Sequence, residues 1–474
     1  MADIILFKGV SHTALPVLAP REPAVVFDPM TGDAKLWIGT TVGNEMVSGG
    51  VAGATGLPGA GMAGVNATAP PAGLVAALGT GAADDAPALQ AQAIYARDHA
   101  ALPLLLAPGV YRLLLPLIVG AAPATGVGGI QSGWTLRGSG PNGNVYAGTG
   151  GVTLTLGTPN QPAVLLLGDG GPRSSRLTDL TLDGGADANA TKFGLWNGGY
   201  TWWSALAADH VIISNVDTAV AVTGTGQIAP SRGSNGEMLN LSDCHLQPRK
   251  ALYVNSTDGG QAFPTVWEKI DAWITQKGGT AFTFGGPSPV PYGLSSSPGM
   301  LDQNGGNNFS CFGLSLSMSD DGPAQQSAAS LTNTFAHVYG AESLVFIGNR
   351  TEHVGTLIEW ISGSAGLASL VTMTGILHDG MNGYKPLLKG GGGGEHFKFI
   401  ITGCTFHNTA SPPPPLTFAF APSGGVSSSV AVFTDCDFDG YSSYAALLSD
   451  PHVVLVRCRT RVAGTDPYVD AVHV

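Results

Sequence analysis

Leu177-Thr-Asp-Leu-Thr-Leu182 is the first clear copy of a six-residue pattern that decides the fold of this 474-residue chain. The pattern is an apolar residue, two free positions, an apolar residue, one free position, and an apolar or small residue. It returns, in whole or in part, at Ile213–Thr218, Leu241–Leu246, Ile270–Trp273, Phe309–Leu314, Ile401–Phe406, Phe433–Phe438 and Leu455–Cys458.

The copies recur every 20 to 40 residues or so, with the alternation that is typical of strands, and this indicates stacked coils of one elongated domain. Leucine-rich repeats would keep a fixed period, whereas here the period wanders. In a β-helix only the strands must stay in register, so the loops between them can have any length. We therefore predict an all-β fold, a right-handed single-stranded parallel β-helix. The expected inward residues at the central position are Leu180, Val216, Cys244, Trp273, Phe312, Cys404, Cys436 and Cys458.

The cysteine pattern predicts free thiols. Five cysteines are an odd number, they are widely spread, and none forms the CxxC spacing of a metal or redox site. Cysteine at the central position of several coils fits an inward row in which small apolar side chains stack on one another. No metal site and no cofactor is expected.

Composition narrows the class of partner. Only 11% of the residues are charged and the formal net charge is −12, which argues against nucleic acid or an anionic membrane as partner. The 44% hydrophobic content excludes disorder for the bulk of the chain. No apolar run is long enough to insert into a membrane, and the first residues lack the features of a signal peptide. We therefore expect synthesis in a cytoplasm.

Composition also divides the chain into three regions. Residues 1–48 hold short apolar runs, residues 49–72 are a Gly/Ala/Pro-rich linker without charge, and residues 73–474 form the β-helix. One helix is expected at Ala86–His99, after Asp84 and Asp85, with Leu89, Ala93 and Ile94 on one face. This helix would cap the open N-terminal end of the stack.

Four segments resemble the opening of pectate-lyase-like β-helix domains, in the order found in that family. They are Leu78–Gln90, Leu104–Tyr111, Trp134–Gly140 and Leu177–Gly184.

The N-terminal region is similar to the small modules that open many bacteriophage tail fibres and tailspikes, through Leu18–Ala24 and Phe27–Gly39. Together the two matches resemble a phage tailspike, or receptor-binding protein. That resemblance implies a homotrimer in the virion tail, attached to a tail or baseplate protein through residues 1–48. It also implies that the β-helix binds a host surface polysaccharide and acts as its depolymerase. A purely adhesive or structural tail component, and a bacterial polysaccharide lyase or hydrolase, are the alternatives.

Outward positions of the predicted coils supply candidate catalytic residues. Asp217 and His245 would be stacked neighbours, with Asp243 alongside. A carboxylate pair at about 5 to 9 Å is what glycoside hydrolysis requires. The alternative is structural, because Asp and Asn also satisfy the amides of turns. Asp179 and Asp183 are weaker candidates, since their segment is mainly a structural signature in the resembling family.

Two further clusters are candidates. Glu268 and Asp271 lie three residues apart between two tryptophans, and Arg350, Glu352, His353 and Glu359 combine acids, a base and a cation that could neutralise a uronate in a lyase. Charged strand edges are the alternative for both.

Aromatic residues suggest a binding loop. Trp196, Tyr200, Trp202 and Trp203 fall in one Gly-rich stretch, where flat rings could pack on the apolar faces of sugars or, alternatively, on the protein itself. The sequence leaves open hydrolase, lyase or no catalysis.

Overall fold

The computed structural model divides the chain into two compact units, Met1–Gly64 and Val65–Val474. The first unit is described only through the backbone of its four strands. The described residues are 5–8, 23–27, 34–40, 43–49, 64–99, 102–119, 134–141, 151–167, 175–186, 191–197, 206–222, 239–256, 265–286, 308–319, 333–338, 343–360, 369–381, 385–390, 397–420, 430–464 and 469–471.

The first unit holds a four-stranded sheet in the order β1-β2-β3-β4. β1 (Ile5–Lys8) runs parallel to β2 (Pro23–Phe27), and β3 (Ala34–Thr40) and β4 (Gly43–Gly49) continue the sheet in antiparallel fashion. The small strands expected in residues 1–48 are therefore present.

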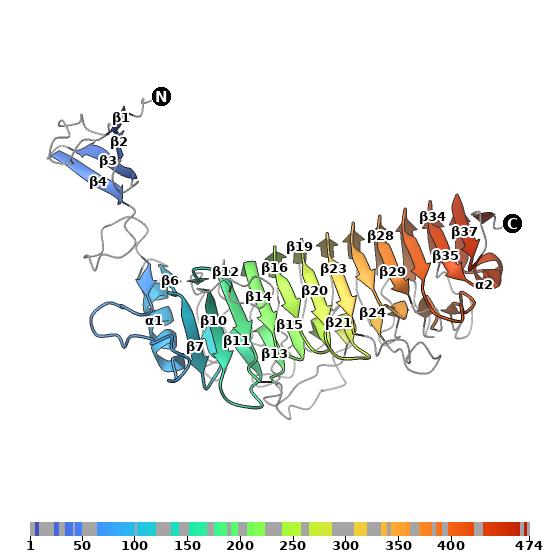
Figure 1. Ribbon diagram of the computed structural model, residues 1–474, viewed down its shortest axis with the longest axis horizontal. Coiled ribbons are helices and arrows are strands. Elements are labelled where there is room, and N and C mark those ends of the chain that lie inside the picture. Colours follow the sequence, from blue (N-terminus) through green and yellow to red (C-terminus); the bar gives the residue numbers. More distant parts are fainter. Residues whose placement is uncertain are drawn as a thin grey trace. The chain divides into compact units, whose positions relative to one another are not determined.

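The second unit is built from three parallel ladders of strands, which the chain visits in turn (Figure 1). Ladder 1 contains β5 (Val65–Asn66), β6 (Pro103–Leu105), β9 (Thr135–Arg137), the first halves of β12 (Ser175–Asp183) and β14 (Leu206–Ser214), β16 (Leu239–Ser242), β19 (Thr265–Glu268), β22 (Phe309–Phe312), β25 (Ser343–Ile347), β28 (Ser369–Thr374), β31 (Phe397–Thr402), β34 (Val430–Thr434) and β36 (Val453–Val456). Ladder 2 contains β7 (Gly109–Leu113), β10 (Val152–Leu156), the second halves of β12 and β14, β17 (His245–Gln247), β20 (Asp271–Ile274), β23 (Ser315–Met318), β26 (Arg350–Glu352), β29 (Leu377–Met381), β32 (Thr405–Asn408), β35 (Asp437–Tyr441) and β37 (Cys458–Val462). Ladder 3 contains β8 (Leu117–Val119), β11 (Ala163–Leu167), β13 (Phe193–Asn197), β15 (Thr218–Val222), β18 (Ala251–Ser256), β21 (Thr280–Gly286), β24 (Thr334–Val338), β27 (Thr356–Trp360), β30 (Leu388–Gly390) and β33 (Ala419–Phe420).

This arrangement confirms the predicted right-handed parallel β-helix. The second unit already begins at Val65, because Val65 and Asn66 of β5 pair with Leu104 and Leu105 of β6. The predicted linker, residues 49–72, therefore overlaps the first strand of the stack.

A corner between ladders 1 and 2 explains the six-residue pattern. Its third position adopts a left-handed backbone in successive coils, and Gly, Asn, Asp and His tolerate that conformation best. The residues with this backbone at the corner are Asp179, His210, Asp243, Lys269, Gly313, Gly348, Gly375, Gly403, Asp435 and Arg457. The residue that follows the corner points inward. The pattern is thus an apolar residue, a free position and the corner residue, followed by a ladder 2 strand whose side chains point inward and outward in turn.

Five of the eight predicted central residues occupy this inward position, namely Leu180, Cys244, Cys404, Cys436 and Cys458. Val216 is buried but lies in the turn between ladders 2 and 3, because the corner of its coil is at His210. Trp273 and Phe312 were wrongly predicted. Their coils turn at Lys269 and Gly313, so that Ile270 and Leu314 are the inward residues. Trp273 points outward and is 46% exposed.

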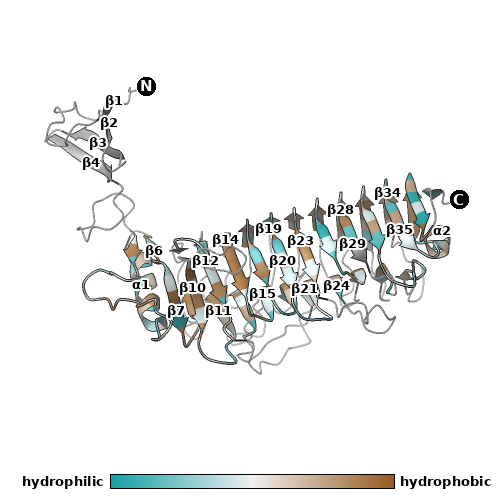
Figure 2. Cartoon of the chain, in the orientation of Figure 1, coloured by the Kyte–Doolittle hydropathy of each residue, from teal (hydrophilic) through white to brown (hydrophobic). Residues whose placement is uncertain are grey.

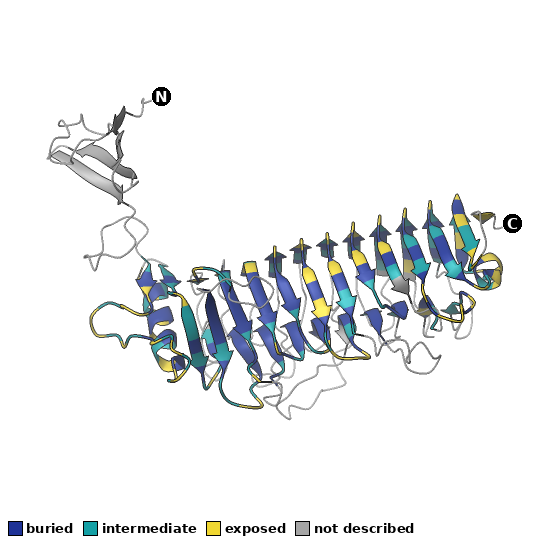
Figure 3. Ribbon diagram, viewed as in Figure 1, coloured by how far each residue is buried: buried dark blue, intermediate teal, exposed yellow. Residues whose placement is uncertain are grey.

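The interior is a continuous apolar stack with alternating strand faces. Figure 2 shows hydrophobic and hydrophilic residues alternating along the strands, and Figure 3 shows the same alternation as buried and exposed bands, most clearly on β20. Aromatic rings fill the middle coils, where Phe282, Phe309 and Phe346 lie with ring centroids 5.4 to 5.9 Å apart. All five cysteines are free and buried, as the sequence predicted.

α1 (Ala86–Asp98) packs on the first strands of the stack, where the capping helix was expected (Figure 1). Leu89 and Ala93 are buried, but Ile94 is 42% exposed, so its assignment to the packed face was wrong. The buried Asp85 carboxylate accepts hydrogen bonds from the amides of Leu78 and Gly79, which ties the preceding turn to the helix. Among the described helices, none is both long and apolar enough to cross a bilayer.

The last coil is held by paired arginines and aspartates. Arg457, Arg459 and Arg461 bind Asp435, Asp437 and Asp439 of the preceding coil through two hydrogen bonds each. β38 (Val469–Ala471) then pairs with β37 in antiparallel fashion, and α2 (Ala445–Ser449) follows β35. Bidentate pairs of this kind fix one strand on its neighbour.

Gly184 ends the signature segment Leu177–Gly184 for a steric reason. A Cβ atom there would lie 2.1 Å from the carbonyl oxygen of Asn215 in the next coil. We expect Gly184→Ala to lower the free energy of unfolding by about 1 to 3 kcal/mol, as overpacking does. Urea denaturation followed by tryptophan fluorescence measures this. Gly348→Ala is the control, because its Cβ meets nothing within 4 Å and only its left-handed backbone is strained. Since the left-handed backbone of Gly348→Ala costs about 1 to 2 kcal/mol by itself, a smaller loss in Gly184→Ala than in Gly348→Ala would contradict the steric explanation.

Candidate functional site

The outward positions of ladder 2 in the last coils form a row of charged side chains. Because side chains alternate along a strand, every second residue of β26, β29, β32, β35 and β37 faces outward. Glu352 pairs in register with Asp379, and His407, Asp439 and Arg461 follow in the next three coils. We define the charged row as these five residues together with Arg350.

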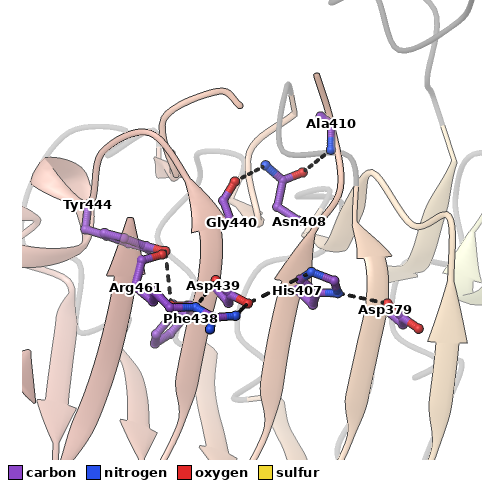
Figure 4. A network of polar contacts seen from close by, with 9 residues as sticks. All are labelled: Asp379, His407, Asn408, Ala410, Phe438, Asp439, Gly440, Tyr444 and Arg461. Atoms are coloured by element: carbon purple, nitrogen blue, oxygen red, sulfur yellow. Dashed lines mark hydrogen bonds and ion pairs between the residues drawn. The ribbon is translucent and has the colours of Figure 1, made fainter. Parts of the chain in front are cut away.

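Short contacts connect the charged row from end to end. Nη2 of Arg350 lies 2.7 Å from Oε1 of Glu352 and 3.3 Å from Oδ2 of Asp379. Nδ1 of His407 lies 3.0 Å from Oδ1 of Asp379, and its Nε2 lies 3.9 Å from Oδ2 of Asp439. Arg461 binds both oxygens of Asp439 (Figure 4). His407 therefore lies between two carboxylates, one in each neighbouring coil.

Both of these carboxylates are held in the ionised form. The hydrogen bond from His407 is the largest cause that lowers the pKa of Asp379, and the hydrogen bond from Arg461 is the largest cause that lowers the pKa of Asp439. An ionised carboxylate only accepts hydrogen bonds, so Nδ1 of His407 must carry a hydrogen and donate it to Asp379. Nε2 is then the ring nitrogen available for proton transfer.

A pocket of about 460 Å³ opens beside the charged row, within the size range of ligand sites. His407, Asp439 and Arg461 line it, together with the proline-rich loop around Pro413. Asn408 holds this loop, because its side chain donates to the carbonyl of Gly440 and accepts from the amide of Ala410 (Figure 4).

Gly440 keeps β35 close to the end of β32 beneath this pocket. Its φ is +82°, and a Cβ would lie 2.2 Å from the carbonyl oxygen of Asn408. The wall of the pocket is therefore backbone at this point, and the shape of the pocket depends on glycine.

The residues predicted to be catalytic do not form one cluster in the structure. His245 and Asp271 are brought together, with Nδ1 and Oδ2 2.8 Å apart. His245 does not stack on Asp217 as predicted, because its neighbour in the preceding coil is Ile212. Asp243 lies at the corner and pairs with Lys269 at 3.4 Å. Glu268 is exposed on β19, on the other side of the corner from Asp271.

Asp217 is the centre of a cluster of cations. Its carboxylate lies 2.9 Å from Nε of Arg249, 3.0 Å from Nζ of Lys250 and 3.3 Å from Nζ of Lys192. Its pKa is lowered, since the hydrogen bonds and charges of Lys250 and Arg249 outweigh the effect of burial, which is the largest single cause and acts in the opposite direction. Only 13% of the carboxylate side chain is exposed. This arrangement fits a structural role at the turn into ladder 3.

We therefore expect Asp217→Asn to destabilise the fold without removing activity. Losing the charge removes the carboxylate that pairs with the mostly buried Arg249, which keeps its hydrogen bond to the carbonyl of Thr191, and this should lower the free energy of unfolding by about 3 kcal/mol. Asp243→Asn is the control, because its pair with Lys269 is exposed and contributes at most about 1 kcal/mol. Thermal unfolding and a glycan cleavage assay measure the two effects. Lost cleavage at unchanged stability would contradict the structural role.

The residues predicted to bind substrate also lie in different places. Trp196 lies in β13 rather than in a loop and is only 4% exposed, packed against Phe193 with ring centroids 5.5 Å apart. It therefore has no ring face to offer a sugar. Tyr200, Trp202 and Trp203 lie outside the described residues. Arg350 and Glu352, in contrast, begin the charged row.

Sequence reasoning missed Asp379, His407, Asp439 and Arg461. The signal was present in the segments His378-Asp-Gly380, Phe406-His-Asn408 and Phe438-Asp-Gly440, each of which has a buried residue followed by an outward polar one. Their alignment needed the register of coils at Gly375 and Gly403, of which only the second was recognised. Among the described residues, no group of three His, Cys, Asp or Glu side chains could hold a metal ion.

Comparison with known proteins gives similarity of structure only. No family model and no curated protein matches the chain. The tailspike gp42 of Acinetobacter phage vb_AbaP_AS12 is 12% identical, with a TM-score of 0.47 over 99% of this chain and 76% of the tailspike. The A-module of the Azotobacter vinelandii mannuronan C-5 epimerase AlgE6 is 15% identical, with a TM-score of 0.43 over 82% of this chain and 98% of the module. ORF18 of Geobacillus virus E2 is 11% identical, with a TM-score of 0.32 over 99% of this chain and 77% of that protein. The likeness is one of fold.

Proposed function

We propose that this chain is a phage tailspike whose β-helix binds and depolymerises a host surface polysaccharide at the charged row. The observation that carries the proposal is the position of His407 between Asp379 and Asp439, in the wall of an open pocket. A proton-carrying imidazole beside a carboxylate is an acid and base pair of the kind used in proton-transfer catalysis.

The surroundings of this pair suit a polymer. The charged row extends over five successive coils, which spans roughly 19 Å at a strand spacing of about 4.8 Å. It lies on an outward strand face, where a long chain can lie without being threaded into a cavity. The net charge of −12 disfavours nucleic acid as the polymer and leaves glycans as the class that fits.

The tailspike part of the proposal rests on the N-terminal region. Residues 1–48 resemble tail-fibre modules, and they belong to a compact unit separate from the β-helix. Under this proposal the chain forms a homotrimer in the virion tail, attached to a tail or baseplate protein through that unit. Multi-angle light scattering of the full chain tests the trimer, and a monomeric mass would contradict it.

Purified bacterial capsular and O-antigen polysaccharides test the activity. We expect the protein to release new reducing ends from at least one of them. Binding without release, measured by co-sedimentation with the polysaccharide, would instead establish the adhesive alternative, for which the pairing of every charge in the row is the favouring observation.

A further inference from the structure

We infer that the charged row cuts a neutral glycan by hydrolysis, and that it does not cut a uronate-containing glycan by β-elimination. The inference rests on the proposed function and adds the substrate class and the type of reaction. It follows from how the charges in β26, β29, β32, β35 and β37 are paired.

Elimination requires a cation that is free to neutralise the carboxylate of the uronate, so that a base can remove the neighbouring proton. The five strands contain three arginines and no lysine. Each arginine already binds a carboxylate of the protein: Arg350 binds Glu352 and Asp379, Arg459 binds Asp437, and Arg461 binds Asp439. A uronate would have to displace one of these carboxylates.

The net charge of the five strands also disfavours a uronate-containing glycan. The five strands carry four carboxylates, Glu352, Asp379, Asp437 and Asp439, against the three arginines. The lowered pKa values of Asp379 and Asp439 keep both of these groups negative at neutral pH. With His407 neutral, as the role of base in an elimination would require, an anionic sugar would therefore meet an excess of like charge, whereas a neutral sugar would not.

Hydrolysis needs an acid and a base, and the row provides them in His407 and Asp439. Their 3.9 Å separation is shorter than the separation of about 5 to 9 Å in a hydrolytic carboxylate pair, so the bound sugar and water must move the two side chains apart. With a proton on Nε2, His407 can protonate the glycosidic oxygen as the bond from that oxygen to the anomeric carbon breaks. The anomeric carbon takes the hydroxyl of a water molecule, and the other proton of that water goes to the carboxylate of Asp439. The 3.9 Å between Nε2 and Oδ2 is too long for a direct transfer, so Asp439 gives its proton to solvent water and His407 takes one up from solvent water, which restores the starting state.

Asp379 has a different part in this scheme. It accepts the hydrogen of Nδ1 at 3.0 Å, so it is a positioning residue that directs Nε2 of His407 toward Asp439. The same bond fixes the tautomer and the orientation of the ring.

Digestion in ¹⁸O-labelled water distinguishes the two reactions. The wild-type protein is incubated with neutral polysaccharides and with uronate-containing polysaccharides, and the fragments are examined by mass spectrometry and ultraviolet absorbance. We expect cleavage of neutral chains, one ¹⁸O at each new reducing end, and no absorbance from an unsaturated uronate. Unlabelled fragments with that absorbance, or cleavage of the uronate-containing chains alone, would overturn the inference while leaving depolymerisation established. Release of no fragment from any polysaccharide would overturn the proposed function itself.

An Asp437→Asn single variant tests whether the paired charges exclude uronate-containing substrates. It frees Arg459 from its carboxylate partner and removes one negative charge beside the row. We expect the KM for a neutral substrate to stay within about twofold, because His407 and Asp439 are untouched. If the wild-type protein cleaved a uronate-containing chain efficiently, and the variant cleaved it no faster, the paired charges would not be what selects the substrate.

Discussion

The His407→Asn variant should lose glycan cleavage by about 10²- to 10⁴-fold in kcat, the contribution usually made by a positioned acid or base. The asparagine amide can occupy the place of Nδ1 and donate to Asp379, as Nδ1 of His407 does at 3.0 Å. It provides nothing at the place of Nε2. The variant thus removes the nitrogen that faces Asp439 and keeps the bond that holds the side chain.

His210→Asn provides the matched control. Nδ1 of His210 lies 2.9 Å from Oδ1 of Asp179, so this pair has the same kind of bond on the same protein. It is exposed at the corner between ladders 1 and 2, and it does not line the pocket. Asparagine also tolerates the left-handed backbone of that position. We expect this variant to cleave at the wild-type rate.

Steady-state rates of reducing-end release and binding to the same polysaccharide are the measurements. Binding by the His407→Asn variant should stay within a few-fold of wild type, because the arginine pairs of the row are untouched. Equal rates for the wild-type protein and the His407→Asn variant would place the chemistry elsewhere on the surface.

The fold was predictable because its signal is repeated. Apolar residues alternate in every coil, so that Leu180, Cys244 and Cys436 could be aligned from the sequence even where loops of different length separate them. The cysteines helped, since a small apolar side chain after the corner stacks on its equivalent in the next coil. A signal carried by many coils survives errors in a few of them.

Individual registers were less predictable, because the corner has no fixed residue type. Asp, His, Lys, Arg and Gly all occupy it, and Lys269 or Arg457 gives no hint of a left-handed backbone. A strand whose outer residue is a tryptophan hides its own alternation, as Trp273 did. Since side chains alternate, a slip of one residue moves every side chain to the other face.

These register errors affected the prediction of the candidate site more than the prediction of the fold. Asp379, His407 and Asp439 lie in three different coils, and only the correct register of all three shows that they meet. Arg350 and Glu352 were selected because they are close in sequence, and they proved to begin the charged row. Asp217 was selected from an incorrect register between coils, and its contacts are with Arg249, Lys250 and Lys192 rather than with His245.

Stability of the β-helix should fall by about 2 kcal/mol between pH 7.5 and pH 5 because of one buried side chain, His378. Its ring is fully buried in ladder 2, stacked on Phe406 with centroids 5.0 Å apart. Burial lowers the pKa of His378 from 6.5 to about 3. Nδ1 shares a hydrogen bond of 2.6 Å with Thr351, whereas Nε2 is buried with no hydrogen-bond partner.

Stability falls as the pH falls because the unfolded chain takes up a proton that the folded protein does not. Below about pH 6.5 the histidine of the unfolded chain takes up a proton, while His378 in the folded state stays neutral until about pH 3. Each acidic step in this window therefore favours the unfolded state, by as much as about 1.4 kcal/mol per pH unit. Above pH 7 both states are neutral, and this contribution to the pH dependence disappears.

His378→Phe removes the titration and keeps an aromatic ring in the stack between Phe335 and Phe406. The phenyl ring leaves the hydroxyl of the buried Thr351 without its partner, so the variant carries a constant cost that does not depend on pH. Chemical denaturation of both proteins at pH 7.5 and pH 5 separates the two effects, because the constant cost cancels in the difference. Carboxylates with lowered pKa values, such as Asp217 and Asp379, act in both proteins alike and at more acidic pH. A wild-type protein whose stability changes with pH no more than that of the variant would show that His378 is protonated inside the fold, and that the core reaches water at this coil.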